Sequence, residues 1–262
     1  MCNPYDAGTP IGREFILTQK SNITEQLTRG IRYVDYRVGI CEATTDKLCM
    51  YHGQVYLKLN FDTALSMIKQ FLVKYPSETV SMRLQHEHGG GLDDFQGFVE
   101  RNVIQHDPAL WYAGKATKPA AAVTLGDVRG KILLFWSSGV KTSAFGYDYD
   151  VINTRTFWEF NNINDMSDTF QRRAMGSNVP GWYENPTSGI VYFLGQHWLP
   201  PDAIDKTARE MLPRVTKIWA ATPMKKGIIS MDYPTDDLIS KFIAVSVDRF
   251  PRRLIRSVSE VV

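Results

Sequence analysis

The sequence predicts an α/β protein that folds as a distorted TIM-type (β/α) barrel. Short apolar runs typical of strands alternate with amphipathic runs typical of helices, and six such strands occur within 262 residues. Alternation of this kind favours a parallel sheet, and (β/α) barrels commonly form single domains of about 250 residues. No internal repeat or linker divides the chain, so we expect residues 1–262 to form one barrel whose first strand is mostly missing at the N-terminal end.

Six runs are predicted as strands because they are short, rich in β-branched or aromatic residues, and bounded by Gly, Pro or polar clusters. Most of them are apolar throughout, as expected when both faces of a sheet are covered. The predicted strands are Ile31–Val38, Leu48–His52, Thr79–Gln85, Lys131–Trp136, Ile190–Gln196 and Gly227–Tyr233.

Five runs show the 3.6-residue periodicity of amphipathic helices. In the predicted helix Phe61–Tyr75, apolar residues fall on one face. Asn60 is placed to cap the start of this helix and Pro76 to end it. The segment from Gly139 to Pro186 is predicted to be irregular, and loops of that length in a compact barrel are usually functional. The predicted helices are Asn22–Arg29, Phe61–Tyr75, Asp93–Gln105, Asp202–Ala220 and Asp236–Phe250.

Composition excludes several classes of protein. Hydrophobic residues make up 44% of the chain and charged residues 22%, which is ordinary for a soluble globular protein. The formal net charge is only +2 and no block of like charge occurs, so nothing indicates a nucleic-acid partner. No apolar run reaches the length of about 18 residues that a membrane-spanning helix needs. Residues 1–10 contain neither the basic nor the apolar segment of a signal peptide, so we expect none in this chain.

The three cysteines are Cys2, Cys41 and Cys49. Cys41 and Cys49 flank a short polar stretch between two predicted strands, so either a disulfide that closes this loop or two reduced thiols is consistent with the sequence. Because the count is odd, at least one thiol stays free or pairs between chains.

The ends of the predicted strands carry titratable and polar side chains, whereas the strand interiors are apolar. The active site of a (β/α) barrel lies at the carboxyl ends of its strands, so this distribution predicts an active site at one rim. A surface ion pair of Asp35 with Arg37, and turn roles for His86 and His88 beside the glycines, are the alternative interpretation. The strand-end residues are Tyr5, Asp6, Asp35, Arg37, His52, Gln85, His86, Glu87, Ser137, Gln196, His197 and Asp232.

Five segments, taken together, resemble the catalytic domain of the phosphatidylinositol-specific phospholipases C of the metal-independent, bacterial kind. They read QLTRGIRYVDYR, YHGQVY, FLVKYPSETV, LGDVRGKI and GIISMDY, and they occur in the order and spacing of that family. The resemblance implies a phospholipase C-like phosphodiesterase barrel that needs no metal ion or other cofactor. It also implies a secreted protein, and we expect a monomer.

The resemblance implies a role for each matching residue. His52 resembles the general acid that protonates the leaving diacylglycerol oxygen. Arg37, next to Asp35, resembles the arginine that contacts the phosphate, where calcium-dependent relatives hold a metal ion. Asp6 matches the aspartate beside the first catalytic histidine, and Asp232 matches the aspartate that orients that histidine.

The chain departs from the family at the general base, because Tyr5 stands where the family has its first catalytic histidine. An imidazole with a pKa near ~6.5 accepts a proton at neutral pH, whereas a phenol with a pKa near ~10 is already protonated there. His86 and His197 are the remaining rim histidines that could replace the base, and His86 is the better placed of the two.

Other departures concern the residues that would contact the substrate. Gln85 stands where bacterial relatives carry a lysine, and Ser137 falls near their inositol-contacting arginine. The pair that packs on the inositol ring matches Asp168 and Phe170, or alternatively Asp165 and Ser167. The substrate-contacting candidates are therefore Gln85, His86, Glu87, Ser137, Asp168, Phe170 and His197.

Three functions remain open on the sequence. The first is a phosphodiesterase that acts on an inositol phospholipid or related phosphodiester by metal-free acid/base catalysis. The second is a catalytically impaired module that binds a lipid headgroup or a protein partner, and the third is an enzyme repurposed for other chemistry. Retention of His52 with Arg37 favours an enzyme, because a binding module needs no proton donor. Trp182 and Trp198 are candidates for transient contact with a membrane surface, the alternative being that they pack against the barrel.

Overall fold

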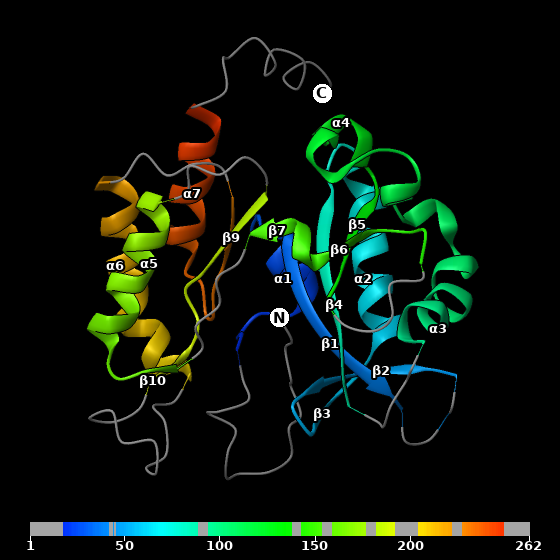
Figure 1. Cartoon of the computed structure of the whole chain (residues 1–262), viewed down its shortest axis with the longest axis horizontal. Coiled ribbons are helices and arrows are strands. Elements are labelled where there is room, and N and C mark those ends of the chain that lie inside the picture. The colour runs from blue at the N-terminus through cyan, green and yellow to red at the C-terminus, as the bar shows by residue number, and fades with distance from the viewer. Residues whose placement is uncertain are drawn as a thin grey trace.

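The computed structural model describes residues 18–41, 44, 46–88, 94–137, 143–153, 159–176, 182–191, 204–221 and 227–248, and the structural statements below concern these residues. They form mostly parallel strands with helices on two sides (Figure 1). None of the described helices is both long and apolar enough to cross a bilayer.

The described strands form three sheets. The largest has the order β3-β2-β1-β4-β5-β6, and within it β1, β4, β5 and β6 run parallel while β2 is antiparallel to β1 and to β3. A second sheet, β11-β9-β7, is parallel, as is the pair β10-β8. The strands are β1 (Tyr33–Ile40), β2 (Leu48–His52), β3 (Val55–Asn60), β4 (Val80–His88), β5 (Ile132–Trp136), β6 (Tyr147–Asp148), β7 (Ile152–Asn153), β8 (Glu159–Phe160), β9 (Trp182–Pro186), β10 (Ile190–Val191) and β11 (Ile228–Ser230).

Helices cover the strands on both sides of Figure 1, with α2 and α3 beside the large sheet and α5, α6 and α7 beside β9 and β10. Short 3-10 helices span Ile104–His106, Pro108–Leu110, Gly114–Ala116, Ala120–Ala122 and Tyr149–Val151. The α-helices are α1 (Ile23–Thr28), α2 (Phe61–Lys74), α3 (Phe95–Asn102), α4 (Leu125–Val128), α5 (Ile163–Gly176), α6 (Ile204–Ala221) and α7 (Asp236–Asp248).

The main core lies between the large sheet and its helices. In β1, Val34, Tyr36 and Val38 are buried in this core, and in α2 the buried side chains recur every three or four residues, as an amphipathic helix requires. Because side chains alternate along a strand, the intervening residues of β1 and β4 face the opposite side of the sheet, which we call the inner face. The predicted outward orientation of Tyr36 and Val38 is confirmed.

Two sequence-based expectations need correction. The segment from Gly139 to Pro186 is not irregular, because it contains α5 and several short strands. Its helix was missed because the apolar residues that pack from α5, namely Ile163, Met166 and Phe170, form only a narrow stripe. The second correction concerns direction, because β2 is antiparallel to β1 and forms a hairpin with β3, which the sequence did not predict.

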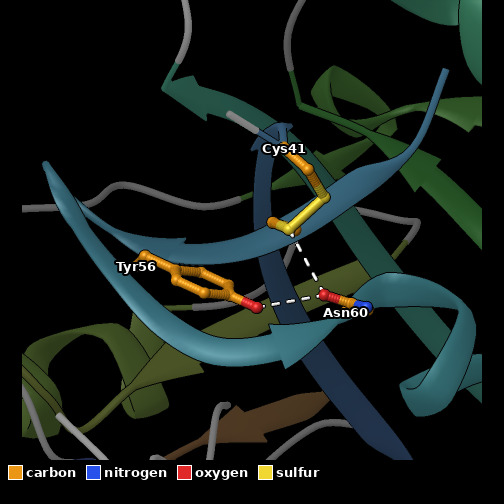
Figure 2. Close-up of a disulfide and its surroundings, with 4 residues drawn as sticks. Cys41, Tyr56 and Asn60 are labelled. Carbon is orange, nitrogen blue, oxygen red and sulfur yellow. Dashed lines mark hydrogen bonds between the residues drawn. A yellow bond between two sulfur atoms is a disulfide. The ribbon is translucent and has the colours of Figure 1, made fainter. Parts of the chain in front are cut away.

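A disulfide joins Cys41 and Cys49, whose Cα atoms lie 5.1 Å apart, and it ties the end of β1 to β2 (Figure 2). This confirms the disulfide interpretation. Asn60 lies against it, with its Oδ1 atom 3.4 Å from the sulfur of Cys49 and 3.0 Å from the hydroxyl of Tyr56, which donates a hydrogen bond. Asn60 occupies the N-cap position of α2, but its side chain does not cap the helix as predicted.

The end of β4 bulges where it passes β1. Val38 pairs with His86 but Gly39 pairs with His88, so Glu87 is the extra residue of the bulge. Gly39 permits this register, because a Cβ atom there would lie 2.3 Å from the backbone oxygen of His88.

We therefore expect Gly39→Ala to lower the free energy of unfolding by about 1–3 kcal/mol, because the new methyl group forces the bulge away from β1. Urea denaturation measures this change. Gly126→Ala in α4 is the control, because its added Cβ would meet nothing closer than 3.6 Å and should cost no stability. Equal stability of the two variants would contradict the proposed role of Gly39.

Candidate active site

Charged and polar side chains occupy the inner face of β1 and β4. Asp35 and Arg37 lie on β1, and their cross-strand partners on β4 are Arg83 and Gln85. Glu87 follows in the bulge, and Ser137 comes directly after β5. Asp35, Arg37, Gln85, Glu87 and Ser137 were predicted site residues, and the structure brings all five together.

Arg83 is a charged residue of this face that the sequence analysis did not single out. Its guanidinium donates to Asp35 Oδ2 at 3.1 Å, to Gln85 Oε1 at 2.9 Å and to Ser137 Oγ at 3.0 and 2.8 Å. Burial by itself would lower the pKa of this guanidinium, but the charge of Asp35 and neighbouring groups raises it above its ordinary value. The signal was present, because Thr79, Ser81, Arg83 and Gln85 give the predicted strand a polar residue at every second position.

A carboxylate and two tyrosines lie beneath Arg83. The guanidinium stacks on the ring of Tyr149 at 4.4 Å, and the hydroxyl of Tyr149 donates to Glu184. Glu184, which is buried on β9, also accepts a hydrogen bond of 3.2 Å from the hydroxyl of Tyr33 on β1. Burial, together with the charge of Glu184, raises the pKa of Tyr33 far above its usual range, so Tyr33 remains a neutral donor. Glu184 therefore links the sheet of β9 to the inner face of β1.

Arg37 lies nearer the mouth of the site than Arg83, with 28% of its side chain exposed. Its Nη1 atom is 3.2 Å from Glu87 Oε1, and its Nε atom is 4.0 Å from Asp35 Oδ2. The guanidinium is thus held by two carboxylates while part of it stays accessible to a ligand.

His52 ends β2 and precedes the two-residue turn of the β2–β3 hairpin, in which His52 pairs with Val55. Gly53 has a positive φ of 59°, a conformation that glycine adopts without strain. The backbone N–H of Gly53 donates to Glu87 Oε1 at 2.7 Å. His52 therefore reaches the neighbourhood of Arg37 through an antiparallel hairpin rather than at the carboxyl end of a parallel strand.

Asp232 follows β11, and its carboxyl interacts electrostatically with Arg37 and Asp35. Burial raises the pKa of its carboxyl to about 7; the positive charge of Arg37 opposes this rise and the negative charge of Asp35 adds to it. The backbone on either side is fixed to the start of the described chain, because Met231 O accepts from Gln19 Nε2 and the Tyr233 N–H donates to Thr18 O.

Three predicted substrate-contacting residues are not brought to this face. His86 lies on the outer face of β4, where its ring stacks on Phe95 of α3 and burial lowers its pKa. Phe170 is buried between α5 and α6, and Asp168 is exposed on α5. Tyr5, Asp6 and His197 lie outside the described residues, as do Cys2 and Trp198. Trp182 packs against Phe135 and donates to Ala120 O, which is the packing alternative rather than a lipid-facing position.

Within the part of the chain that the structure describes, no group of three or more His, Cys, Asp or Glu side chains is arranged to hold a metal ion. Arg37 instead lies between two acidic side chains, Asp35 at 4.0 Å and Glu87 at 3.2 Å. The arrangement suits an anion, because a guanidinium presents a fork of donors to carboxylate or phosphate oxygens and keeps its charge at any working pH.

Residues 13–138 match the model of a family described as phosphatidylinositol-specific phospholipase C, X domain. The chain is 31% identical to PI-PLC X domain-containing protein 1 of Mus musculus over 261 residues, which cover 93% of this chain and 71% of that protein. It is 34% identical to a 1-phosphatidylinositol phosphodiesterase of Listeria monocytogenes over 140 residues, 53% of this chain and 40% of the relative. The chain spans less than half the length of the curated bacterial relatives it matches.

The fold is similar to that of a solved structure, the phosphatidylinositol-specific phospholipase C from Listeria monocytogenes. The TM-score is 0.68 at 24% sequence identity, and the likeness covers 87% of this chain and 83% of the other. This likeness confirms the predicted TIM-type fold.

The raised pKa of Asp232 predicts a pH dependence of stability. A carboxyl with a folded-state pKa of about 7 and an unfolded-state pKa near ~3.9 favours folding when protonated, so its contribution is complete below pH ~4 and is lost as the pH rises through 7. In the wild type we expect the free energy of unfolding to fall by roughly 1–3 kcal/mol between pH 4 and pH 8, a range reduced because the side chain is partly exposed. Asp232→Asn should remove this fall.

Urea denaturation of the wild type and the variant between pH 4 and pH 8 measures this difference. Asp237→Asn, at an exposed aspartate of α7, is the matched control and should keep the wild-type slope. Parallel curves for the wild type and Asp232→Asn would show that Asp232 titrates as an ordinary carboxyl.

Proposed function

The chain belongs to the phosphatidylinositol-specific phospholipase C X-domain family, and we propose that it is a phosphodiesterase that cleaves an inositol phospholipid or a related phosphodiester by acid/base catalysis. The observation that carries the proposal is the accessible guanidinium of Arg37, held on the inner face by Asp35 and Glu87. It supplies a fixed positive charge where a phosphodiester can reach it.

Arg37 binds the phosphate in this proposal and stabilises the charge that develops on its oxygens as the leaving group departs. The Nη1 atom is already oriented by Glu87, so the rest of the fork is presented in a fixed direction. Because the permanent cation of Arg37 lies between Asp35 and Glu87, the reaction as proposed needs no metal ion.

His52 is the proposed acid that protonates the leaving oxygen. In the family pattern the opposite proton transfer needs a histidine at position 5, where this chain has tyrosine. Asp232 is then the proposed residual proton acceptor, because a carboxyl with a pKa of about 7 is half ionised near neutral pH. Such a base is expected to be weaker than an aspartate–histidine pair.

The disulfide supports an oxidising location. Disulfides persist in secreted and extracellular proteins and are rare in the cytosol, so the Cys41–Cys49 bond supports a secreted protein. A phospholipid substrate would be met at a membrane surface, and we propose transient contact there by a monomer.

Tyrosine at position 5 favours a second candidate function, a module that binds a phospholipid headgroup through Arg37 without turning it over. This alternative keeps the same anion site and differs only in the proton transfers.

The test is turnover of phosphatidylinositol vesicles and of a soluble aryl phosphodiester by the purified chain, with and without a chelator. We expect turnover that the chelator does not reduce. Arg37→Ala should lose at least about 10²-fold on both substrates, whereas His52→Ala should lose this much on phosphatidylinositol, whose leaving oxygen needs a proton. Arg101→Ala, which removes an exposed ion pair of α3, is the control. Restoration by calcium after chelation would overturn the metal-free mechanism. Vesicle binding that requires Arg37, without turnover, would establish the binding module instead.

The tyrosine at position 5 gives a separate prediction. Tyr5→His should raise turnover of phosphatidylinositol by more than about tenfold, which corresponds to some 1.4 kcal/mol of barrier, because it restores the imidazole that the family pairs with the aspartate matched by Asp232. The double variant Tyr5→His, Asp232→Asn should lose this gain. A gain below tenfold in steady-state assays would mean that the site has been rebuilt for another phosphodiester.

A further inference from the structure

A carboxylate oxygen of Glu87 contacts both Arg37 and the turn that follows His52, and the proposed reaction assigns roles to Arg37 and His52. Glu87 Oε1 accepts from Arg37 Nη1 at 3.2 Å and from the backbone N–H of Gly53 at 2.7 Å, directly after His52. We propose that Glu87 is a positioning residue, which holds the turn that carries His52 at a fixed place relative to Arg37. This inference rests on the proposed function and assigns Glu87 a role other than contact with the substrate.

The hairpin needs such a tether. β3 lies at the edge of the sheet, and the turn between β2 and β3 has only the residues Gly53 and Gln54. β2 pairs with β1 only through Leu48, Cys49 and Met50, so the end of the hairpin extends beyond this pairing and its turn needs other contacts to hold it. The disulfide between Cys41 and Cys49 fixes the start of β2 to β1, and the Glu87–Gly53 hydrogen bond fixes the opposite end.

The next residue of β4 reinforces the same tether. His88 Nδ1 lies 2.9 Å from Gln54 Oε1, and its ring stacks on Tyr51 at 4.3 Å. The end of β4 therefore contacts the hairpin through two consecutive side chains. The bulge makes this possible, because it adds Glu87 between the pairs Val38–His86 and Gly39–His88.

The surroundings of Glu87 argue against a direct contact with a phosphodiester. Its side chain is only 13% exposed, and Oε1 is occupied by two donors. Oε2 is buried and has no hydrogen-bond partner among the described residues, so it offers no accessible surface. A carboxylate would also repel the anionic substrate, whereas its charge holds Arg37 in place.

A positioning role that acts through the acid depends on the leaving group. Cleavage of an alkyl ester leaves an alkoxide that must be protonated, whereas a nitrophenolate leaves without a proton. Loss of Glu87 should therefore slow cleavage of the alkyl diester far more than cleavage of the nitrophenyl diester. A general loss of structure would slow both equally.

The experiment compares wild type, Glu87→Ala, Glu87→Gln and His52→Ala on an inositol phosphate alkyl ester and on the matching nitrophenyl ester. We expect kcat of Glu87→Ala to fall at least about tenfold further on the alkyl ester than on the nitrophenyl ester, because loss of the Arg37 partner slows both reactions whereas loss of the His52 tether slows only the first. His52→Ala should show the same selectivity. Glu87→Gln should recover part of the loss, because its amide oxygen can still accept from Gly53.

Glu78→Gln is the matched control, because Glu78 pairs with Arg32 at the opposite end of the same two strands. It should leave both rates unchanged. Hydrogen exchange of the Gly53 amide, followed by NMR, gives a readout that needs no turnover, and it should speed up by at least about tenfold in Glu87→Ala.

The possible outcomes separate the two proposals. A wild type that cleaves neither ester refutes the proposed function. An active wild type whose Glu87→Ala variant loses both rates equally, or keeps Gly53 protected from exchange, overturns the positioning role. Selective loss on the alkyl ester with an unprotected Gly53 amide establishes it.

Discussion

The buried guanidinium of Arg83 is the constraint on which the rest of the site depends. A buried charge is tolerated only when it is paired and hydrogen-bonded, and losing one partner of such a pair typically costs about 3–5 kcal/mol. Arg83 meets this requirement with Asp35, Gln85 and Ser137 on three neighbouring segments of the inner face. These partners are consequently fixed in orientation, and Asp35 in turn faces Arg37.

The inner face is arranged in layers by this requirement. Beneath Arg83, Tyr149 and Tyr33 both donate to Glu184, and apolar side chains such as Phe135 and Trp182 pack next to them. Above it, Arg37 and Glu87 form the accessible layer. Positive and negative groups alternate from the interior toward the mouth, and among the described residues of these layers Arg37 is the more exposed of the two guanidiniums.

The sequence resemblance matches Arg37, Asp35 and His52 to the phosphate-binding half of the family pattern, and it places Tyr5 where the family has the histidine of the base half. Gln85 matches a lysine of the bacterial relatives, and its Oε1 atom accepts a hydrogen bond from Arg83. The positive charge on β4 is therefore carried by Arg83, two residues earlier in the strand, where it pairs with Asp35. In the proposed function, both changes concern proton transfer and headgroup contact rather than the phosphate contact of Arg37.

The sequence by itself determined the barrel class, the strands that carry the site and most residues of its inner face, because alternation along β1 and β4 depends only on local backbone geometry. It could not determine that β2 returns antiparallel, or that His86 packs outward on Phe95, since both follow from contacts between segments distant in the chain. Asp168 and Phe170 lie on α5, a helix that the sequence analysis did not predict because its apolar stripe is narrow. The position of α5 follows from its packing against α6, which is distant in the chain. Whether a polar side chain such as Arg83 is a surface group or the buried centre of a site is decided only by tertiary structure, because its free energy depends on the partners that folding brings within hydrogen-bonding distance.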